Sequence, residues 1–345
     1  MGRPIPPCVL ETDMKKTGLA IIILLSLALA GCAHVTASEY DIPYSMPWTA
    51  GSALVHAMDT NTLVFHFMSG EGIDIPYASN SQKWGDACLI VFPEGSTMLI
   101  DSAMSGYSEV LTANLRKMGI EKIDFFVLSH PHDDHYGGLL VEGGLLDSFE
   151  IGLVYLNGTV NGNFDSKAKI EGSIEAHSVP YQILSAGDEL EIDGVRIRCL
   201  SPDRNVVGTS CTVTEDINGT SLVLRFDYGE VSALFTGDIY APKERELVTM
   251  YGRLLDVDIL KIPHHGNNTS SCAEFAAAVS PQVAVATGGL MMTTNVYYSY
   301  AKTGAKVLFD AVDGYITIMT DGKDIEVSTS RERETDYYEK YEYRK

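Results

Sequence analysis

Short apolar runs recur along the chain from Leu63 onward, and most are bounded by glycine, proline, serine or aspartate. Runs of this length between turn-forming residues are typical of buried β-strands. The pattern predicts strands at residues 63–67, 87–92, 98–100, 123–128, 151–156, 195–200, 221–226, 231–235, 259–262, 283–287, 306–309, 315–319 and 325–328.

Three other segments have the apolar spacing of an amphipathic helix: residues 107–118, 242–255 and 272–279. In the first of them, Val110, Leu111 and Leu115 fall on one side of a helix. The predicted strands arrive partly in pairs and partly separated by helices. This order favours a layered α/β protein with mixed sheets over a strictly alternating Rossmann fold.

The N-terminal segment has the pattern of a signal peptide. Residues 19–30 are apolar or small apart from Ser26, and Lys15 and Lys16 precede them. This run is short for a membrane span. Cys32 follows in the sequence Leu-Ala-Gly-Cys, which resembles the lipobox of bacterial lipoproteins, where the cysteine is lipidated and becomes the mature N-terminus. An ordinary signal peptide followed by a coincidental cysteine is the alternative.

These features predict four parts of the chain. Residues 1–32 form a signal peptide with lipobox, and residues 33–60 form a polar tether. Residues 61–330 form one folded domain, and residues 331–345 form a charged, tyrosine-rich tail. We therefore expect an exported protein held to the membrane by a lipid anchor alone, at the cell surface or in the periplasm.

The charge balance is strongly acidic, with 25 lysines and arginines against 46 aspartates and glutamates and a formal net charge of −21. Such a surface repels nucleic acid, so we expect no stable nucleic-acid complex. It does not exclude a metal centre that acts on a phosphodiester, because bound cations invert the local field. The cysteines form no CxxC pair, which removes support for a zinc ribbon. Cys88 and Cys199 lie in apolar runs and are expected in the core.

The strongest chemical signal is the motif HxHxDH, which follows the predicted strand 123–128 and contains His130, His132, Asp134 and His135. His130 and His132 alternate like strand positions and can point the same way. The chain then turns, so that Asp134 and His135 can face a second metal. Imidazole and carboxylate ligands suit zinc, with manganese or iron possible. A chance cluster of surface histidines is the alternative, and three of nine histidines within six residues disfavour it.

This motif is the signature of the metallo-β-lactamase superfamily, which the sequence resembles over roughly residues 63–328. The resemblance implies the α/β fold of that superfamily, a four-layer αββα sandwich with a dinuclear site at the strand ends. Asp101 ends a predicted strand, as an aspartate does in the family. It would then orient motif residues by hydrogen bonds and would not bind metal. A helix-capping aspartate is the alternative.

Two downstream motifs extend the resemblance. Asp238, in Thr-Gly-Asp after a predicted strand, resembles the family's bridging aspartate. A carboxylate shared by two cations offsets their repulsion at a spacing of about 3.5–4 Å. His264 and His265, in Pro-His-His-Gly, resemble the last ligand motif of the competence-type (ComEC-like) branch. There one histidine binds metal and its neighbour contacts substrate or donates a proton, and the sequence does not say which is which.

One expected ligand is absent. Family members supply a histidine between the first motif and the bridging aspartate, and the histidine in that interval here is His177. It lacks a strand-end setting, so we predict a surface residue. Asn218 stands near the expected place, in the Asn-x-x-Ser pattern that competence-type members carry. We predict a weak oxygen ligand or a substrate contact, with a turn residue as the alternative. Loose occupancy of the first metal position would follow.

The resemblance implies two divalent metal ions, with zinc favoured and manganese as the alternative, that lower the pKa of a bridging water and polarise the bond under attack. Under this assignment the ligands of one ion are His130, His132 and Asp238, and those of the other are Asp134, His135, Asp238 and either His264 or His265. The catalytic residues are expected to be Asp101, Asp134, His264 and His265.

The competence-type branch favours a hydrolase that acts on a phosphodiester, in a small molecule or a polymer. An ester, lactone or β-lactam hydrolase is the alternative within enzymes, and the missing middle histidine disfavours a β-lactamase. A non-catalytic surface lipoprotein that binds metal or a ligand is the alternative from another class. Loss of ligands would mark such a protein, and here all but one of the family's ligand positions are filled.

Overall fold

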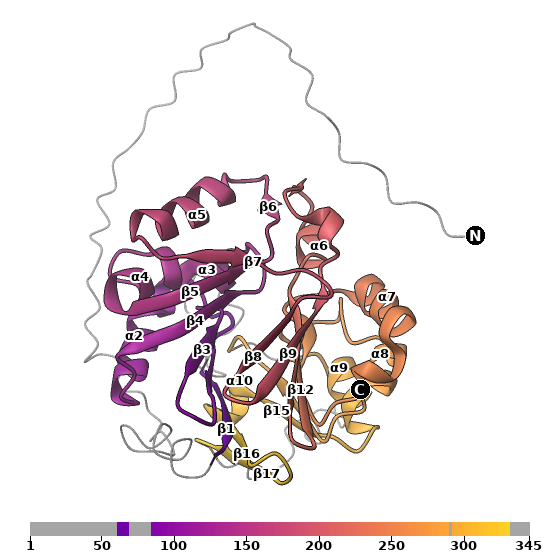
Figure 1. Ribbon diagram of the computed structural model, residues 1–345. Helices are drawn as coiled ribbons and strands as arrows, with labels where there is room; N and C mark the ends of the chain where they lie inside the picture. The colour runs from indigo at the N-terminus through magenta and orange to yellow at the C-terminus, as the bar shows by residue number, and fades with distance from the viewer. Residues whose placement is uncertain (1–60, 69–83, 290–291, 332–345) are drawn as a thin grey trace, which may run out of the picture.

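The computed structural model describes residues 61–68, 84–289 and 292–331, in which two large sheets pack face to face between two layers of helices (Figure 1). The first sheet has eight strands. In spatial order they are β17 (Ile325–Thr329), β16 (Ile316–Thr320), β1 (Leu63–Phe67), β2 (Cys88–Val91), β3 (Thr97–Ile100), β4 (Lys122–Leu128), β5 (Glu150–Leu156) and β7 (Tyr181–Ile183).

The second sheet has seven strands. Their spatial order is β15 (Lys306–Phe309), β14 (Val283–Ala286), β13 (Ile259–Lys261), β12 (Val231–Phe235), β11 (Val223–Tyr228), β9 (Val195–Ser201) and β8 (Glu189–Ile192). A small parallel pair joins β6 (Val160–Asn161) to β10 (Ser210–Cys211). Strands β3, β4, β5 and β7 run parallel, and so do β12, β13, β14 and β15.

An aromatic core joins the inner faces of the two sheets. The rings of Phe67 in β1 and Phe235 in β12 stack with centroids 5.8 Å apart, and Phe65 meets Phe226 of β11 edge to face at 6.1 Å. Burying one such side chain stabilises the fold by about 1.5–3 kcal/mol, and a favourable ring pair adds about 0.5–1.5 kcal/mol. The alternation of residues along each strand therefore supplies one face to this core and the other face to the helices.

Helices cover both outer faces. The first sheet is covered by α2 (Ser108–Lys117), α3 (Asp133–Leu140), α4 (Leu145–Ser148) and α5 (Ser166–Ala176). The second sheet is covered by α7 (Ala241–Tyr251), α8 (Ala273–Val279) and α9 (Thr294–Ala301). Shorter turns are α6 (Thr214–Asn218), α10 (Asp310–Asp313) and the 3-10 segments η1 (Ser105–Tyr107), η2 (Arg204–Val206), η3 (Gly252–Leu255) and η4 (Pro263–Gly266). The predicted four-layer αββα sandwich is confirmed.

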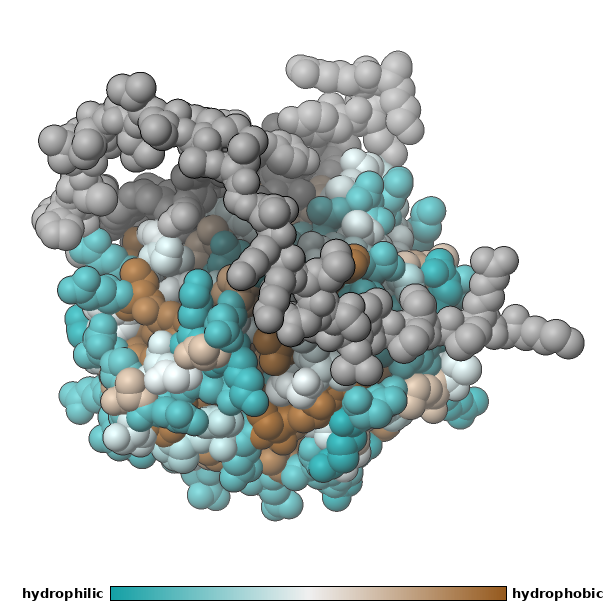
Figure 2. Space-filling model, turned by 90° about the horizontal axis from the view of Figure 1, so that it is seen from above, coloured by the Kyte–Doolittle hydropathy of each residue, from teal (hydrophilic) through white to brown (hydrophobic). Residues whose placement is uncertain are grey.

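Apolar residues gather in three buried clusters, one between the sheets and one under each helical layer. Seen from above (Figure 2), hydrophilic residues make up most of the coloured surface, and apolar residues form patches between them. Cys88 and Cys199 are buried as predicted. Among the described residues, we find no helix long and apolar enough to cross a membrane.

Every predicted strand exists, with ends within two residues of the predicted ones. The predicted helix 242–255 is wrong at its end, because Gly252 has a φ of 50° and stops α7 at Tyr251. The predicted signal peptide (1–32) and tether (33–60) lie outside the described residues, as does the tail beyond Arg331.

Helix α3, which the apolar pattern did not reveal, depends on two glycines. A Cβ at Gly137 would lie 2.4 Å from the backbone nitrogen of Ser105, and one at Gly138 would lie 2.2 Å from the carbonyl oxygen of Ser102. The helix therefore lies directly on the chain segment that follows β3. This close approach brings the first turn of α3, with Asp134 and His135, against the end of that strand.

We predict that Phe226→Ala lowers the free energy of unfolding by about 3–5 kcal/mol, because the substitution leaves a cavity in the core between the sheets. Denaturant unfolding of the metal-free domain measures this loss. Met250→Ala on exposed α7 is the control and should leave the unfolding free energy nearly unchanged. Equal effects of the two substitutions would contradict the packing described here.

Candidate metal centre

The chemical motifs lie where parallel strands end. Asp101 follows β3 and His130 follows β4 in the first sheet, while Asp238 follows β12 and His265 follows β13 in the second. Carboxyl ends of adjacent parallel strands lie at the same edge of a sheet. Because the two sheets pack face to face, these two edges adjoin, and residues more than a hundred positions apart become neighbours.

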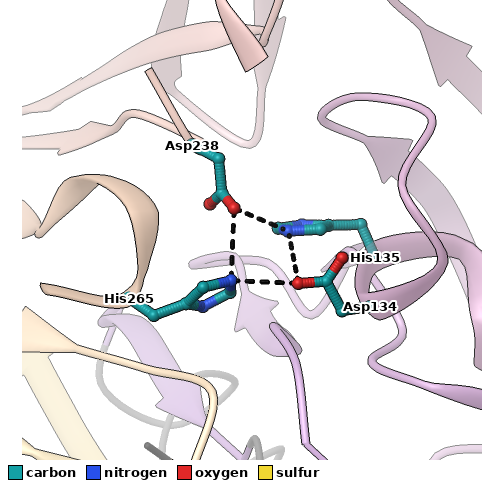
Figure 3. A group of neighbouring side chains, drawn as sticks. All are labelled: Asp134, His135, Asp238 and His265. Atoms are coloured by element: carbon teal, nitrogen blue, oxygen red, sulfur yellow. Dashed lines mark hydrogen bonds and ion pairs between the residues drawn. The ribbon is translucent and has the colours of Figure 1, made fainter. Parts of the chain in front are cut away.

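Four buried side chains form the centre of the site: Asp134, His135, Asp238 and His265 (Figure 3). Each offers one ligand atom, and these atoms all lie within 4.8 Å of one another. His265 Nε2 lies 3.1 Å from Asp134 Oδ2 and 3.2 Å from Asp238 Oδ2. His135 Nε2 lies 3.2 Å from that same oxygen of Asp238. Two nitrogens and two carboxylates that converge in this way suit a divalent metal ion.

A second pair of imidazoles adjoins this group. His130 Nε2 lies 2.9 Å from His132 Nδ1, and the ring of His130 lies 4.1 Å from that of His135 between centroids. Burial and the neighbouring rings of His135 and His132 hold the pKa of His130 well below its ordinary value. His130 is therefore neutral, which is the form in which imidazole binds metal. The structure thus brings together all four residues of the HxHxDH motif.

Asp101 holds the motif in place through three hydrogen bonds. It accepts one from the backbone nitrogen of Ser129 (2.8 Å) and one from the hydroxyl of Ser129 (2.7 Å), and His135 Nδ1 lies 2.8 Å from its Oδ2. The helix-capping alternative does not apply, because the next helical segment, η1, has Met104 as its N-cap. The Asp101 carboxylate orients His135 so that Nε2 faces the centre.

Negative charge dominates the four-residue group. Burial lowers the pKa of His135, but the carboxylates of Asp238, Asp134 and Asp101 outweigh burial and hold that pKa well above its ordinary value. Burial likewise lowers the pKa of His265, and Asp238 is the main group that raises it well above normal. The surroundings therefore favour positive charge on both rings. A divalent cation satisfies the same demand by replacing the protons, so the donor set fits a metal ion.

His264 lies beside this group and not in it. Its Nδ1 is 2.5 Å from the hydroxyl of Thr269, and its ring lies 4.8 Å from that of Tyr240 between centroids. Burial lowers the pKa of His264 to about 4. His264 and His265 have φ values of 48° and 54°, a region that ordinary residues adopt where the surroundings impose it, often at functional sites. The two rings lie 5.8 Å apart between centroids, and His265 is the one that joins the four-residue group.

Asn218 ends α6 and is buried, and its side-chain oxygen Oδ1 has no hydrogen-bond partner among the described residues. Such an orphaned oxygen costs about 1–3 kcal/mol, which a bound cation would offset. The same segment is tied to the site, because the hydroxyl of Ser221 accepts a hydrogen bond from the backbone nitrogen of Asp238. His177 lies at the exposed end of α5 and pairs with Asp147 at 3.0 Å, so the prediction of a surface residue is confirmed.

Two charged residues of the site escaped the sequence analysis. Asp86 lies just before β2, and its Oδ1 is 3.0 Å from His265 Nδ1. Lys261 ends β13 and forms a buried ion pair with Asp86, while its Nζ lies 3.5 Å from Asp238 Oδ1. A lysine inside an apolar strand was a signal for Lys261, since unpaired lysines are rarely buried. Nothing in the local pattern distinguished Asp86 from a turn residue.

Comparison with known proteins identifies the family of this chain. A family model described as the beta-lactamase superfamily domain matches residues 82–288. The chain therefore belongs to this superfamily. It is 32% identical over 181 residues to Competence protein ComA of Neisseria gonorrhoeae, and 28% identical over 182 residues to ComE operon protein 3 of Bacillus subtilis. The chain thus lies in the ComEC-like branch.

Each of these matches covers 52% of the chain but 22% of the relative, so the chain corresponds to about a fifth of the length of those proteins. Among solved structures, the metallo-β-lactamase fold protein YhfI of Bacillus subtilis covers 77% of the chain and 100% of its own length, with a TM-score of 0.48 and 14% identity.

The two neighbouring histidines give a direct test of the metal centre. We predict that His265→Ala lowers the metal content of the purified domain by at least one ion per chain, because His265 belongs to the four-residue group. His264→Ala is the matched control and should retain wild-type metal content. Elemental analysis by mass spectrometry measures both. Loss of metal from the His264 variant alone would contradict the assignment.

Proposed function

We propose that this chain is a metal-dependent hydrolase of phosphodiester bonds that acts outside the cytoplasm. The observation that carries the proposal is the buried group of Asp134, His135, Asp238 and His265, with His130 and His132 directly beside it. These are the ligand types and the arrangement that support hydrolysis by two metal ions.

The residues present fit two divalent cations. Asp134, His135, Asp238 and His265 would hold one of them, and His130, His132 and Asp238 the other, with the orphaned Oδ1 of Asn218 as a further oxygen donor. When bound, such ions supply a water activated near neutral pH and polarise the bond under attack. The mixture of imidazole and carboxylate favours zinc, with manganese as the alternative.

Protein residues around this centre have separable tasks. Asp101 fixes the ring of His135 through Nδ1, and Ser129 holds Asp101. His264 is half-buried and is held through Nδ1 by Thr269, so Nε2 is the ring atom left to contact an oxygen of the substrate. We assign His264 to substrate contact and His265 to metal binding.

The choice of a phosphodiester draws on the relatives and on charge. One relative, from Neisseria gonorrhoeae, is named for competence, and another, from Haemophilus influenzae, is named for recombination. The net charge of −21 repels long polyanions, so we propose a small phosphodiester or a short stretch of a polymer that meets the metal ions directly. A stable complex with nucleic acid is not part of the proposal.

Hydrolysis of bis-p-nitrophenyl phosphate by residues 33–345 with added zinc or manganese tests the chemistry. Asp134→Ala should lower kcat/KM by at least about 100-fold, because it removes a metal ligand. Asp147→Ala, the same substitution in an exposed ion pair, should leave kcat/KM unchanged.

Two other outcomes would contradict the proposal. Absence of turnover in a protein with two bound metals would overturn the phosphodiester proposal and favour carboxylic esters or lactones. Absence of both turnover and metal would favour a non-catalytic binding protein.

We also propose export and lipid attachment, on the basis of residues 1–32 alone. In bacteria that produce the full chain, Cys32→Ser should abolish labelling by radioactive palmitate and shift the protein out of the membrane fraction, because the thiol is the site of lipid attachment. Labelling that persists in this variant would exclude Cys32 as that site.

A further inference from the structure

Beneath the metal centre lies a buried pair of opposite charges, Asp86 and Lys261. Asp86 is 5% exposed and Lys261 is 4% exposed. Asp86 precedes β2 of the first sheet, and Lys261 ends β13 of the second, so their ion pair crosses the interface between the sheets. Burial of two charges costs free energy unless further contacts compensate, and both side chains make such contacts.

The contacts of Asp86 lead to one metal-binding ring. Oδ1 of Asp86 accepts a hydrogen bond from the hydroxyl of Thr287 and lies 3.0 Å from His265 Nδ1. The backbone nitrogen of Asp86 donates to the carbonyl oxygen of Asp134 at 3.0 Å, and its carbonyl accepts from Ala103 at 2.7 Å. Asp86 is therefore fixed by its backbone and its side chain. The ring of His265 is fixed in turn, with Nε2 toward Asp134 and Asp238.

Lys261 contacts another residue of the four-residue group, Asp238. Its ammonium group donates to the carbonyl oxygen of Gly237 at 3.1 Å and lies 3.5 Å from Asp238 Oδ1. Lys261 thus offsets the charge of Asp86 and holds the peptide that carries Asp238. The other oxygen of Asp238, Oδ2, is the one that faces His135 and His265.

We propose that Asp86 is a positioning residue for His265, and that Lys261 is the charge partner that keeps Asp86 aimed at this ring. The arrangement repeats the contact of Asp101 with His135, in which a carboxylate lies 2.8 Å from Nδ1 and leaves Nε2 for the metal. The first sheet thereby contributes His135 and the second contributes His265. In both rings, Nδ1 is held by a buried carboxylate that belongs to the first sheet. This inference rests on the metal centre proposed above and requires no particular substrate.

The test measures metal affinity by competition with a chromophoric chelator, using the domain from residue 33 to residue 345 and zinc as the probe. Asp86→Asn should weaken the tightest zinc binding by about 10- to 100-fold, the usual effect of losing a partner of a metal-binding histidine. Unchanged affinity in this variant would overturn the proposal.

A double variant separates positioning from charge balance. Asp86→Asn combined with Lys261→Met removes both charges, keeps the net charge of the site and leaves no unpaired ion in the core. Lys261→Met alone is the reference, because both variants lose the contacts of Lys261 with Gly237 and Asp238. If Asp86 positions His265, zinc affinity of the double variant stays about 10- to 100-fold below that of Lys261→Met. If Asp86 only balances Lys261, the two variants bind zinc equally, and the proposal is wrong.

A matched control comes from an ion pair of the same residue types at the surface. Nζ of Lys122 lies 3.2 Å from Oδ1 of Asp124, and both side chains are partly exposed. Lys122→Met with Asp124→Asn should leave zinc affinity unchanged. The absorption spectrum of the cobalt-substituted protein adds a second readout, because it reports the coordination geometry and should change in the Asp86 variants alone. Neither measurement needs turnover, so a protein that binds zinc without hydrolysing phosphodiesters still tests Asp86.

Discussion

Packing of the two sheets against each other through the rings of Phe65, Phe67, Phe226 and Phe235 brings together the two halves of the metal site. The group of Asp134, His135, Asp238 and His265 is complete only when both sheets contribute. The first supplies Asp134 and His135, and the second supplies Asp238 and His265 (Figure 3). A shift of one sheet relative to the other would separate the two halves. The aromatic core therefore contributes to chemistry by fixing distances, as well as to stability.

The centre gathers more negative charge than the protein itself neutralises. Asp86, Asp101, Asp134 and Asp238 are all buried, and among the described residues the buried lysine beside them is Lys261. Burial raises the pKa values of Asp86, Asp134 and Asp238, but His135, His265 and Lys261 outweigh burial and hold these pKa values below the ordinary range in the metal-free fold. The same carboxylates attract divalent cations, which would replace the protons of the two rings.

Strands and motif residues could be predicted from the sequence because both are local signals. A buried strand appears as an apolar run, and HxHxDH lies within six consecutive residues. Helix α3 could not be predicted in this way, since Gly137 and Gly138 weaken its helical pattern and are needed for a close approach to the segment after β3. The resemblance to a known superfamily supplied the layer order that the local pattern left open.

The roles within the site depended on contacts that no local pattern contains. His264 and His265 are identical in type and adjacent, and only their contacts with distant residues distinguish them: His265 meets Asp134 and Asp238, whereas His264 meets Thr269. The contact between Asp86 and His265 joins residues 179 positions apart. Asn218 could be recognised as a candidate from its spacing, but the absence of a partner for Oδ1 among the described residues is a property of the folded chain.

A metal ion held jointly by the two sheets would also act as a cross-link between them. Ligands that bind only the folded state stabilise it by mass action, by about 2.7 kcal/mol at a concentration 100 times the dissociation constant. Because the ligands Asp134 and His265 come from different sheets, this stabilisation resists their separation directly. The lifetime of the folded protein would then follow the supply of metal around it. In metal-poor surroundings the chain would lose its resistance to proteases together with the proposed activity.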